Sequence, residues 1–141
     1  MAKTKAGVIN IYDIDKTKSE ALVNQLKQNF KDTGFVSADS IGGLKIEGAD
    51  LLINATPIGM KETDPCVVDG GSLHKNLLVY DLIYNPGETK LLKLAKQKGA
   101  RVSNGLGMLL YQGAASFELW TGYLAPIEIM RQALNGGVKN L

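Results

Sequence analysis

The feature that most constrains this chain is a series of short apolar runs separated by turn residues. Residues 49–57 and 77–83 are nearly continuous apolar runs, which is typical of parallel strands covered on both faces. Residues 7–13 form a β-branched run that ends at Asp13. Two shorter strands are predicted, an edge strand at 35–38 and another at 100–103.

Segments in which apolar residues recur with a helical period lie between these runs. The helix predicted over 17–30 is expected to bury one face, which carries Ala21, Leu22, Leu26 and Phe30. Further helices are predicted at 88–98, where Gly99 would cap the end, at 105–120, and at 126–134, where Pro126 would begin the helix. This alternation predicts an α/β fold with a mainly parallel sheet, and we interpret residues 1–141 as a single domain.

Composition excludes several classes of protein. Sixteen basic and 14 acidic residues leave a net charge of +2, too small an excess for a nucleic-acid-binding surface. A single cysteine, Cys66, and a single histidine, His74, argue against a disulfide framework and a metal site. No apolar run reaches the roughly 18 residues of a membrane span, and the polar residues 1–5 do not resemble a signal peptide, so we expect a cytoplasmic protein without a membrane partner.

Polar and glycine residues collect where the predicted strands end. In open parallel sheets, ligands bind beyond the carboxyl ends of the strands. This rule selects Asp13 and the segments 54–57, 84–86 and 104–108 as candidate site loops.

The same loops carry a resemblance to a known family. Residues 50–60 (DLLINATPIGM), 79–92 (VYDLIYNPGETKLL) and 104–114 (NGLGMLLYQGA), followed by Phe117 and the segment 120–122, are similar to three consecutive motifs of shikimate dehydrogenases. The motifs occur in the family's order and cover most of residues 7–135. The chain is thereby identified as a member of the shikimate and quinate dehydrogenase family.

The resemblance implies an activity and a division of labour between two domains. The family's oxidoreductases transfer hydride between a nicotinamide cofactor, usually NADP, and C3 of 3-dehydroshikimate or shikimate, in chorismate and aromatic amino-acid biosynthesis. The family's first domain binds most of the substrate and supplies a catalytic Lys–Asp pair, and this chain resembles only the Rossmann-like nucleotide-binding half. We therefore expect no catalytic residue and no metal here, and little or no activity from the chain alone.

One part of the family's nucleotide domain has no counterpart in the sequence. The glycine-rich turn that holds the pyrophosphate at a helix N-terminus is absent, because Gly42-Gly43 and Gly136-Gly137 neither follow strands nor open helices. The chain is thus expected to form a Rossmann-like three-layer domain that lacks its first βα unit. In the usual strand order the lost strand is central, so the remaining strands must close a gap or borrow a partner.

The resemblance assigns roles to individual residues. Tyr84 and Gln112 match substrate-binding positions, where a phenol and an amide can hydrogen-bond hydroxyls and a carboxylate. The positions that match cofactor contacts are Asp13, Asn54, Ala55, Thr56, Leu82, Gly105 and Met108.

Asp13 bears on the choice between NAD and NADP. It aligns with the start of an Asn-Arg-Thr motif that binds the NADP 2′-phosphate, whereas this chain has Asp13, Ile14 and Asp15. A carboxylate accepts hydrogen bonds from ribose hydroxyls but repels a phosphate, which favours NAD. Lys16 and Lys18 lie nearby and weaken that inference, and either aspartate could instead cap the following helix.

Structural alternatives remain open for the other positions. Asn54 and Thr56 could satisfy backbone groups at a strand end, and Leu82 and Met108 could be ordinary core residues. His74 and Cys66 are expected to be a surface residue and a small apolar filler, and Trp120 a core or interface residue.

A second functional class also remains. The chain could be an assembly module that completes a separate polypeptide carrying the substrate domain, or that self-associates as a homodimer, since unpaired strand edges recruit partners. A third possibility is a relic without function.

Overall fold

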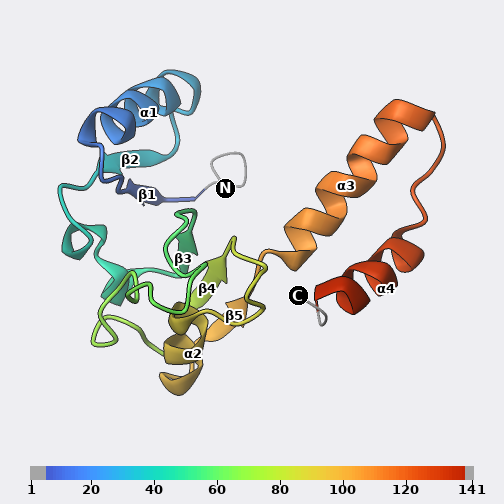
Figure 1. Ribbon diagram of the computed structural model, residues 1–141. Helices are drawn as coiled ribbons and strands as arrows, with labels where there is room; N and C mark the ends of the chain where they lie inside the picture. The colour runs from blue at the N-terminus through green and yellow to red at the C-terminus, as the bar shows by residue number, and fades with distance from the viewer. Residues whose placement is uncertain (1–5, 139–141) are drawn as a thin grey trace. The chain divides into compact units, whose positions relative to one another are not determined.

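The computed structural model describes residues 6–138, and it divides into two compact units (Figure 1). The first unit is Met1–Gly48 and the second is Ala49–Leu141. All the described strands pair in parallel, in a two-stranded sheet of order β1-β2 and a three-stranded sheet of order β3-β4-β5. This arrangement confirms the α/β fold with parallel pairing that the sequence predicted. No described strand pairs with the second edge of β1 or of β3.

The first unit is a βαβ unit followed by two short 3-10 helices. Strand β1 (Val8–Ile11) runs into helix α1 (Lys16–Asn29), which returns the chain to β2 (Gly34–Ser37). Helix α1 begins at Asp15, whose carboxylate accepts the backbone N–H of Thr17, a standard N-cap. The 3-10 helices η2 (Gly42–Leu44) and η3 (Ile46–Gly48) complete the unit.

Helix α1 buries a face that coincides only in part with the predicted one. Ser19 and Val23 are buried and the predicted Leu26 and Phe30 are half-buried, whereas Leu22 is 43% exposed and Ala21 is also exposed. The buried face includes a serine because the Ser19 hydroxyl lies 2.7 Å from that of Ser37 at the end of β2. The hydroxyl pair lets a serine occupy a position that apolar periodicity assigns to a hydrophobic residue.

The second unit begins with a three-stranded sheet. Strands β3 (Leu51–Asn54), β4 (Leu78–Asp81) and β5 (Arg101–Ser103) pair in sequence order, and α2 (Lys90–Gln97) packs against β4 and β5. Thr89 caps the start of α2 by accepting the N–H of Leu92, and Gly99 follows the helix at φ +77°, the left-handed geometry predicted for it.

The core of the second unit lies between β4 and α2. Leu77 and Val79 have no exposed surface, and Leu91, Leu92 and Ala95 of α2 cover them. The prediction that residues 49–57 form a strand covered on both faces is wrong, because Ile53 of β3 is 40% exposed. The reason is that α2 lies over β4 and β5, and no described strand pairs with the outer edge of β3.

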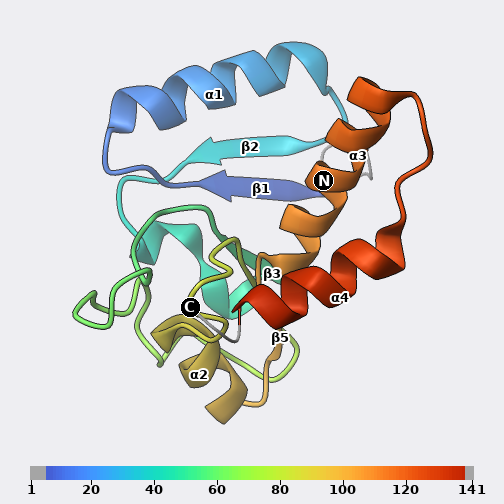
Figure 2. The same ribbon diagram turned by 45° about the vertical axis from the view of Figure 1, so that its right-hand side comes forward.

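Two helices complete the second unit and pack against each other as a hairpin (Figure 2). They are α3 (Leu106–Thr121), which ends at Gly122 with φ +73°, and α4 (Ile127–Val138). Arg131 of α4 lies over the Tyr111 ring of α3, 5.9 Å from its centroid. No helix among residues 6–138 is long and apolar enough to cross a membrane.

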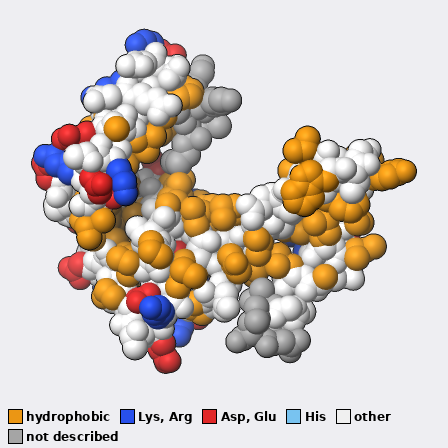
Figure 3. All heavy atoms as spheres, turned by 45° about the horizontal axis from the view of Figure 1, so that its top comes forward, with side chains coloured by type: hydrophobic (Ala, Val, Ile, Leu, Met, Phe, Trp, Pro, Cys, Tyr) orange, Lys and Arg blue, Asp and Glu red, His pale blue; other side chains and the backbone are white. Residues whose placement is uncertain are grey.

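The hairpin leaves a group of large apolar side chains exposed (Figure 3, right-hand side). Trp120 is 81% exposed and Leu124 is 89% exposed, so Trp120 does not belong to a core in this chain. The others are Tyr111, Leu119, Tyr123 and Ile129. We call these six residues the hairpin apolar surface.

Candidate functional site

The carboxyl ends of β3 and β4 are joined by a buried polar contact. Asn54 and Asp81 are register partners at the last positions of the two strands, and both are buried. The Asn54 amide nitrogen donates to the Asp81 carboxylate over 3.1 Å and to the Ile58 carbonyl over 3.2 Å. This pair fixes the point at which the loop after β3 leaves the sheet.

Asp81 makes two further hydrogen bonds with neighbouring segments. Its Oδ1 also accepts the backbone N–H of Ile83 over 3.1 Å, and its Oδ2 accepts the Thr89 hydroxyl over 2.7 Å. Thr89 in turn caps α2, so the carboxylate links the end of β4 to the start of that helix.

The β3 exit loop (residues 54–59) is organised by side chains of its own. The side-chain oxygen of Asn54 (Oδ1) accepts both the N–H and the hydroxyl of Thr56, at 3.1 and 2.8 Å. Gly59 has φ +114°, and its N–H is bound by Asp64. Hydrogen bonds from the N–H groups of Lys61 and Gly59 hold the pKa of Asp64 below its usual value. Asn54 therefore has the structural role that was one alternative for it, while Ala55 and Thr56 stay exposed.

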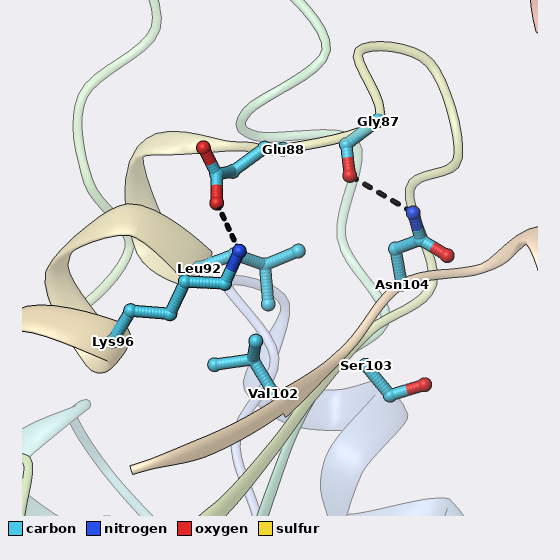
Figure 4. A pocket seen from close by; sticks show the side chains of 7 residues that line it. All are labelled: Gly87, Glu88, Leu92, Lys96, Val102, Ser103 and Asn104. Atoms are coloured by element: carbon cyan, nitrogen blue, oxygen red, sulfur yellow. Dashed lines mark hydrogen bonds and ion pairs between the residues drawn. The ribbon is translucent and has the colours of Figure 1, made fainter. Parts of the chain in front are cut away.

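The loops after β4 and β5 meet at Gly105. A β-carbon at Gly105 would lie 1.9 Å from the Leu82 carbonyl oxygen, and the Gly105 N–H donates to the Ile83 carbonyl over 3.1 Å. Asn104 reinforces the meeting by donating to the Gly87 carbonyl and accepting the N–H of Leu106 (Figure 4). The structure thus brings Leu82 and Gly105, both predicted cofactor positions, into direct backbone contact.

A depression of about 280 Å³ lies beside this junction. Figure 4 shows its walls, where the Glu88 carboxylate and the Lys96 ammonium point toward each other and form an ion pair. Asn104 is engaged by Gly87, and the apolar lining comes from Leu92 and Val102. Since the charged lining groups are paired with each other, we assign no ligand to this depression.

The side chains available for a ligand are different ones. Tyr84 is 40% exposed and Met108 is 38% exposed, and Gln112 is exposed one turn after Met108 on the same face of α3. Among the described residues, neither the Tyr84 hydroxyl nor the Gln112 amide has a hydrogen-bond partner within the protein. These groups are free to bind the hydroxyls or carboxylate of a ligand.

In the first unit the two aspartates after β1 have distinct roles. The Asp13 carboxylate accepts the backbone N–H of Asp15 over 2.9 Å and stabilises the turn, while Asp15 caps α1. The hydrogen bond from the Thr17 hydroxyl holds the pKa of Asp15 below its usual value. The helix-capping alternative therefore applies to Asp15 and not to Asp13.

The two lysines near this turn are held by carboxylates. Lys16 lies 2.6 Å from Asp39 and 3.7 Å from Glu20, and its pKa is raised, chiefly by the hydrogen bond to Asp39. Lys18 lies 3.7 Å from Asp15. Their charge is thus already matched by neighbouring acidic groups.

Within the part of the chain that the structure describes, no group of three or more His, Cys, Asp or Glu side chains could hold a metal ion. Cys66 is a free, half-buried thiol and His74 is half-buried in a loop.

Sequence reasoning missed the two residues that organise this edge, Asp81 and Thr89. The signal was present in the sequence, because Asp81 is a charged residue inside an otherwise apolar run. A carboxylate at such a position is rarely tolerated without partners.

Parallel strands with intervening helices, and free polar groups beyond their carboxyl ends, define a Rossmann-like α/β protein. Comparison with known proteins identifies the family. Residues 105–134 match the family model described as the shikimate 5′-dehydrogenase C-terminal domain. A shikimate dehydrogenase (NADP(+)) from Methanopyrus kandleri is 46% identical over 125 residues, which are 83% of this chain and 42% of that protein.

Solved structures agree with this result. A crystal structure of a shikimate dehydrogenase in complex with NADP+ superposes with a TM-score of 0.79 at 34% identity, over 95% of this chain and 55% of that one. A quinate dehydrogenase from Corynebacterium glutamicum in complex with NAD gives a TM-score of 0.79 at 30% identity, over 90% of this chain and 45% of that one. The chain belongs to the shikimate dehydrogenase family and corresponds to its C-terminal part. It spans about half the length of the curated relatives it matches.

Proposed function

We propose that this chain is the nucleotide-binding part of an NAD(P)-dependent oxidoreductase that interconverts 3-dehydroshikimate and shikimate. The observation that carries the proposal is the 46% identity to a shikimate dehydrogenase over 83% of the chain. The free Tyr84 and Gln112 side chains beyond the β-sheet support it, because they match the residues by which this family reaches its substrate.

The residues at the carboxyl edge of β3–β4–β5 fit the nicotinamide end of the cofactor. The exposed Ala55 and Thr56, the Leu82–Gly105 backbone contact and the side chain of Met108 offer a partly apolar surface with nearby backbone polar groups. The sequence contains no glycine-rich phosphate loop, so we assign no residue to the pyrophosphate. When bound, the nicotinamide ring supplies or accepts the hydride.

The chain's own residues would bind and orient the substrate. The Tyr84 hydroxyl can donate or accept, and the Gln112 amide can do both at once, so together they can hold a hydroxyl or carboxylate without exchanging protons near neutral pH. Asp81, the one buried carboxylate among the described residues, is bonded to neutral donors inside the protein. We therefore assign proton transfer to the Lys–Asp pair that the resemblance places in the family's first domain.

We further propose that residues 1–141 form one nucleotide-binding domain without its first βα unit, completed by a substrate-binding polypeptide. Among the described residues, β1 and β3 each have one edge without a partner strand, which supports a domain that lacks part of its sheet. The hairpin apolar surface supports a partner, since exposed apolar groups of this size mark interaction sites. Self-association through the same surface is the second candidate.

Calorimetric titration and an activity assay test the proposed function. We expect the purified chain to bind NAD or NADP weakly, with a Kd in the millimolar range, and to oxidise no shikimate, because it has neither a phosphate loop nor an acid–base pair. Adding the first half of the Methanopyrus kandleri relative is expected to restore turnover and to co-elute with the chain. Turnover by the chain alone would contradict the division of labour. If neither binding nor turnover appears with the added half, the proposed function is wrong.

The finer proposal is that the chain prefers NAD to NADP. Asp13 places a carboxylate at the end of β1, and the two described lysines near it, Lys16 and Lys18, are paired with acidic groups and not with a 2′-phosphate site. Asp13→Asn keeps the acceptor for the Asp15 N–H while removing the charge. We expect it to raise the affinity for NADP relative to NAD about tenfold, from the loss of one repulsive charge pair near the surface.

The selectivity prediction is checked by titrating both nucleotides into each variant at constant ionic strength. Asp32→Asn is the matched control, because it removes the same charge from an exposed position at the other end of α1. An NADP-to-NAD ratio that is the same in Asp13→Asn and Asp32→Asn would overturn the role of Asp13.

A further inference from the structure

Asp81 is a buried ionisable group whose hydrogen bonds all come from neutral donors. It has no exposed surface, and its oxygens accept the Asn54 amide, the Ile83 N–H and the Thr89 hydroxyl. No described lysine or arginine forms an ion pair with it. A buried charge is costly unless its hydrogen-bond partners are held in place, so the three donors must be fixed relative to one another.

Each of these donors belongs to a different segment. Asn54 ends β3, Ile83 follows β4, and Thr89 begins α2. Thr89 also accepts the N–H of Leu92, so the carboxylate is joined through one hydroxyl to the positive end of the α2 dipole. The hydrogen bonds and the helix dipole thus stabilise the carboxylate without a cation from any residue that the structure describes.

The groups proposed to contact ligands are attached directly to these donors. Asn54 holds Thr56 in the β3 exit loop through two hydrogen bonds. Ile83 precedes Tyr84 in the chain, and its carbonyl accepts the Gly105 N–H at the start of α3. A change in one carboxylate would thus be transmitted to the cofactor side and the substrate side of the site together.

We propose that Asp81 is a positioning residue whose carboxylate sets the placement of Thr56 relative to Tyr84. The proposal rests on the proposed function for the identity of the ligand. It does not place Asp81 in contact with cofactor or substrate, and its role is exerted through Asn54 and Ile83.

A purely structural role of Asp81 and a positioning role lead to different expected results. If Asp81 only supports the cap of α2, then Thr89→Val should reproduce every effect of Asp81→Ala. If Asp81 positions the loops, Thr89→Val should lower the melting temperature while leaving the arrangement of Thr56 and Ile83 intact, because Asn54 and Ile83 still donate to the carboxylate.

The experiment compares Asp81→Ala, Asp81→Asn and Thr89→Val at a temperature where all are folded by circular dichroism. We expect Asp81→Ala to speed amide hydrogen exchange at Thr56 and Ile83 about tenfold or more and to weaken NAD binding by a similar factor. Asp81→Asn keeps the shape and an acceptor oxygen, so we expect both properties to return to within about threefold of the original chain. Thr89→Val should change neither.

Each result decides the proposal. Equal changes in Asp81→Ala and Thr89→Val, or unchanged exchange in Asp81→Ala, would overturn it. If the original chain binds no nucleotide even with the added first half of the Methanopyrus kandleri relative, the proposed function fails, and the exchange rates still test the positioning role. If Asp81→Ala does not fold, Asp81→Thr replaces it, because threonine fills the space but its one oxygen cannot satisfy all three donors, and the same faster exchange is expected.

Discussion

Replacing Gly105 with alanine is expected to destabilise the second unit by about 3 kcal/mol or more. The added β-carbon would lie 1.9 Å from the Leu82 carbonyl oxygen and 2.6 Å from its carbonyl carbon. Both are backbone atoms, so no side-chain rotation can relieve the overlap. The conformation of Gly105 itself is ordinary, at φ −74° and ψ −3°, which alanine adopts without strain. The cost therefore comes entirely from the close approach of the two loops.

Gly107→Ala is the matched control for this substitution. The same β-carbon at Gly107 meets nothing within 4 Å, and the residue lies exposed in the first turn of α3. Alanine is expected to leave stability unchanged or to raise it by up to about 1 kcal/mol, because it lowers the entropy of the unfolded chain. Urea denaturation of the two variants checks the pair. Similar free energies of unfolding for both would mean that the two loops separate easily.

Gly105→Ala is also expected to weaken nucleotide binding. Leu82 and Gly105 are both predicted cofactor positions, and they can approach so closely only because one of them has no side chain. If stability falls while NAD affinity in the folded fraction does not change, the junction has a structural role and the cofactor assignment of Gly105 is wrong.

The fold was largely predictable because its strands and helices are regular and local. The predicted strand at 100–103 and the helix at 105–120 match β5 (Arg101–Ser103) and α3 (Leu106–Thr121) within one or two residues. Turn residues mark these boundaries without help from tertiary contacts, as Gly99 and Gly122 show by their left-handed conformations.

Burial was less predictable because it depends on what covers each element. The runs at 49–57 and 77–83 look alike in sequence, yet only the second is covered by α2. In α1, the hydroxyl pair between Ser19 and Ser37 joins residues 18 positions apart, which no periodicity within the helix can reveal.

The candidate site was predictable only where a local motif marks its residues. Tyr84 and Gln112 are exposed, and their role as substrate contacts stays a prediction. Asp81 and Thr89 were missed because their importance lies in hydrogen bonds between segments. Asn54 was predicted from its motif, but its engagement with Asp81 and Ile58 follows only from the geometry of the strand ends.

Leu77→Ala is expected to lower the free energy of unfolding of the second unit by about 3 kcal/mol. Leu77 adjoins β4 and has no exposed surface, so truncation removes its apolar contacts and leaves a cavity in close-packed surroundings. Ile53→Ala removes a side chain of equal size from β3, where it is 40% exposed. We expect it to cost less than about 1.5 kcal/mol, because water already reaches part of that side chain.

Native-state hydrogen exchange at the β4 amides measures the free energy of unfolding of the second unit in both variants. The measurement does not depend on the stability of residues 1–48, which belong to the other unit. A cost for Ile53→Ala equal to that of Leu77→Ala would mean that the side chain of Ile53 is covered in solution, as a partner packed on that face of the sheet would require. Adding the first half of the Methanopyrus kandleri relative then tests whether that half is what covers β3. If that half covers β3, the cost of Ile53→Ala should rise toward that of Leu77→Ala when it is added, and the cost of Leu77→Ala should stay the same, because Leu77 is already fully enclosed by its own unit.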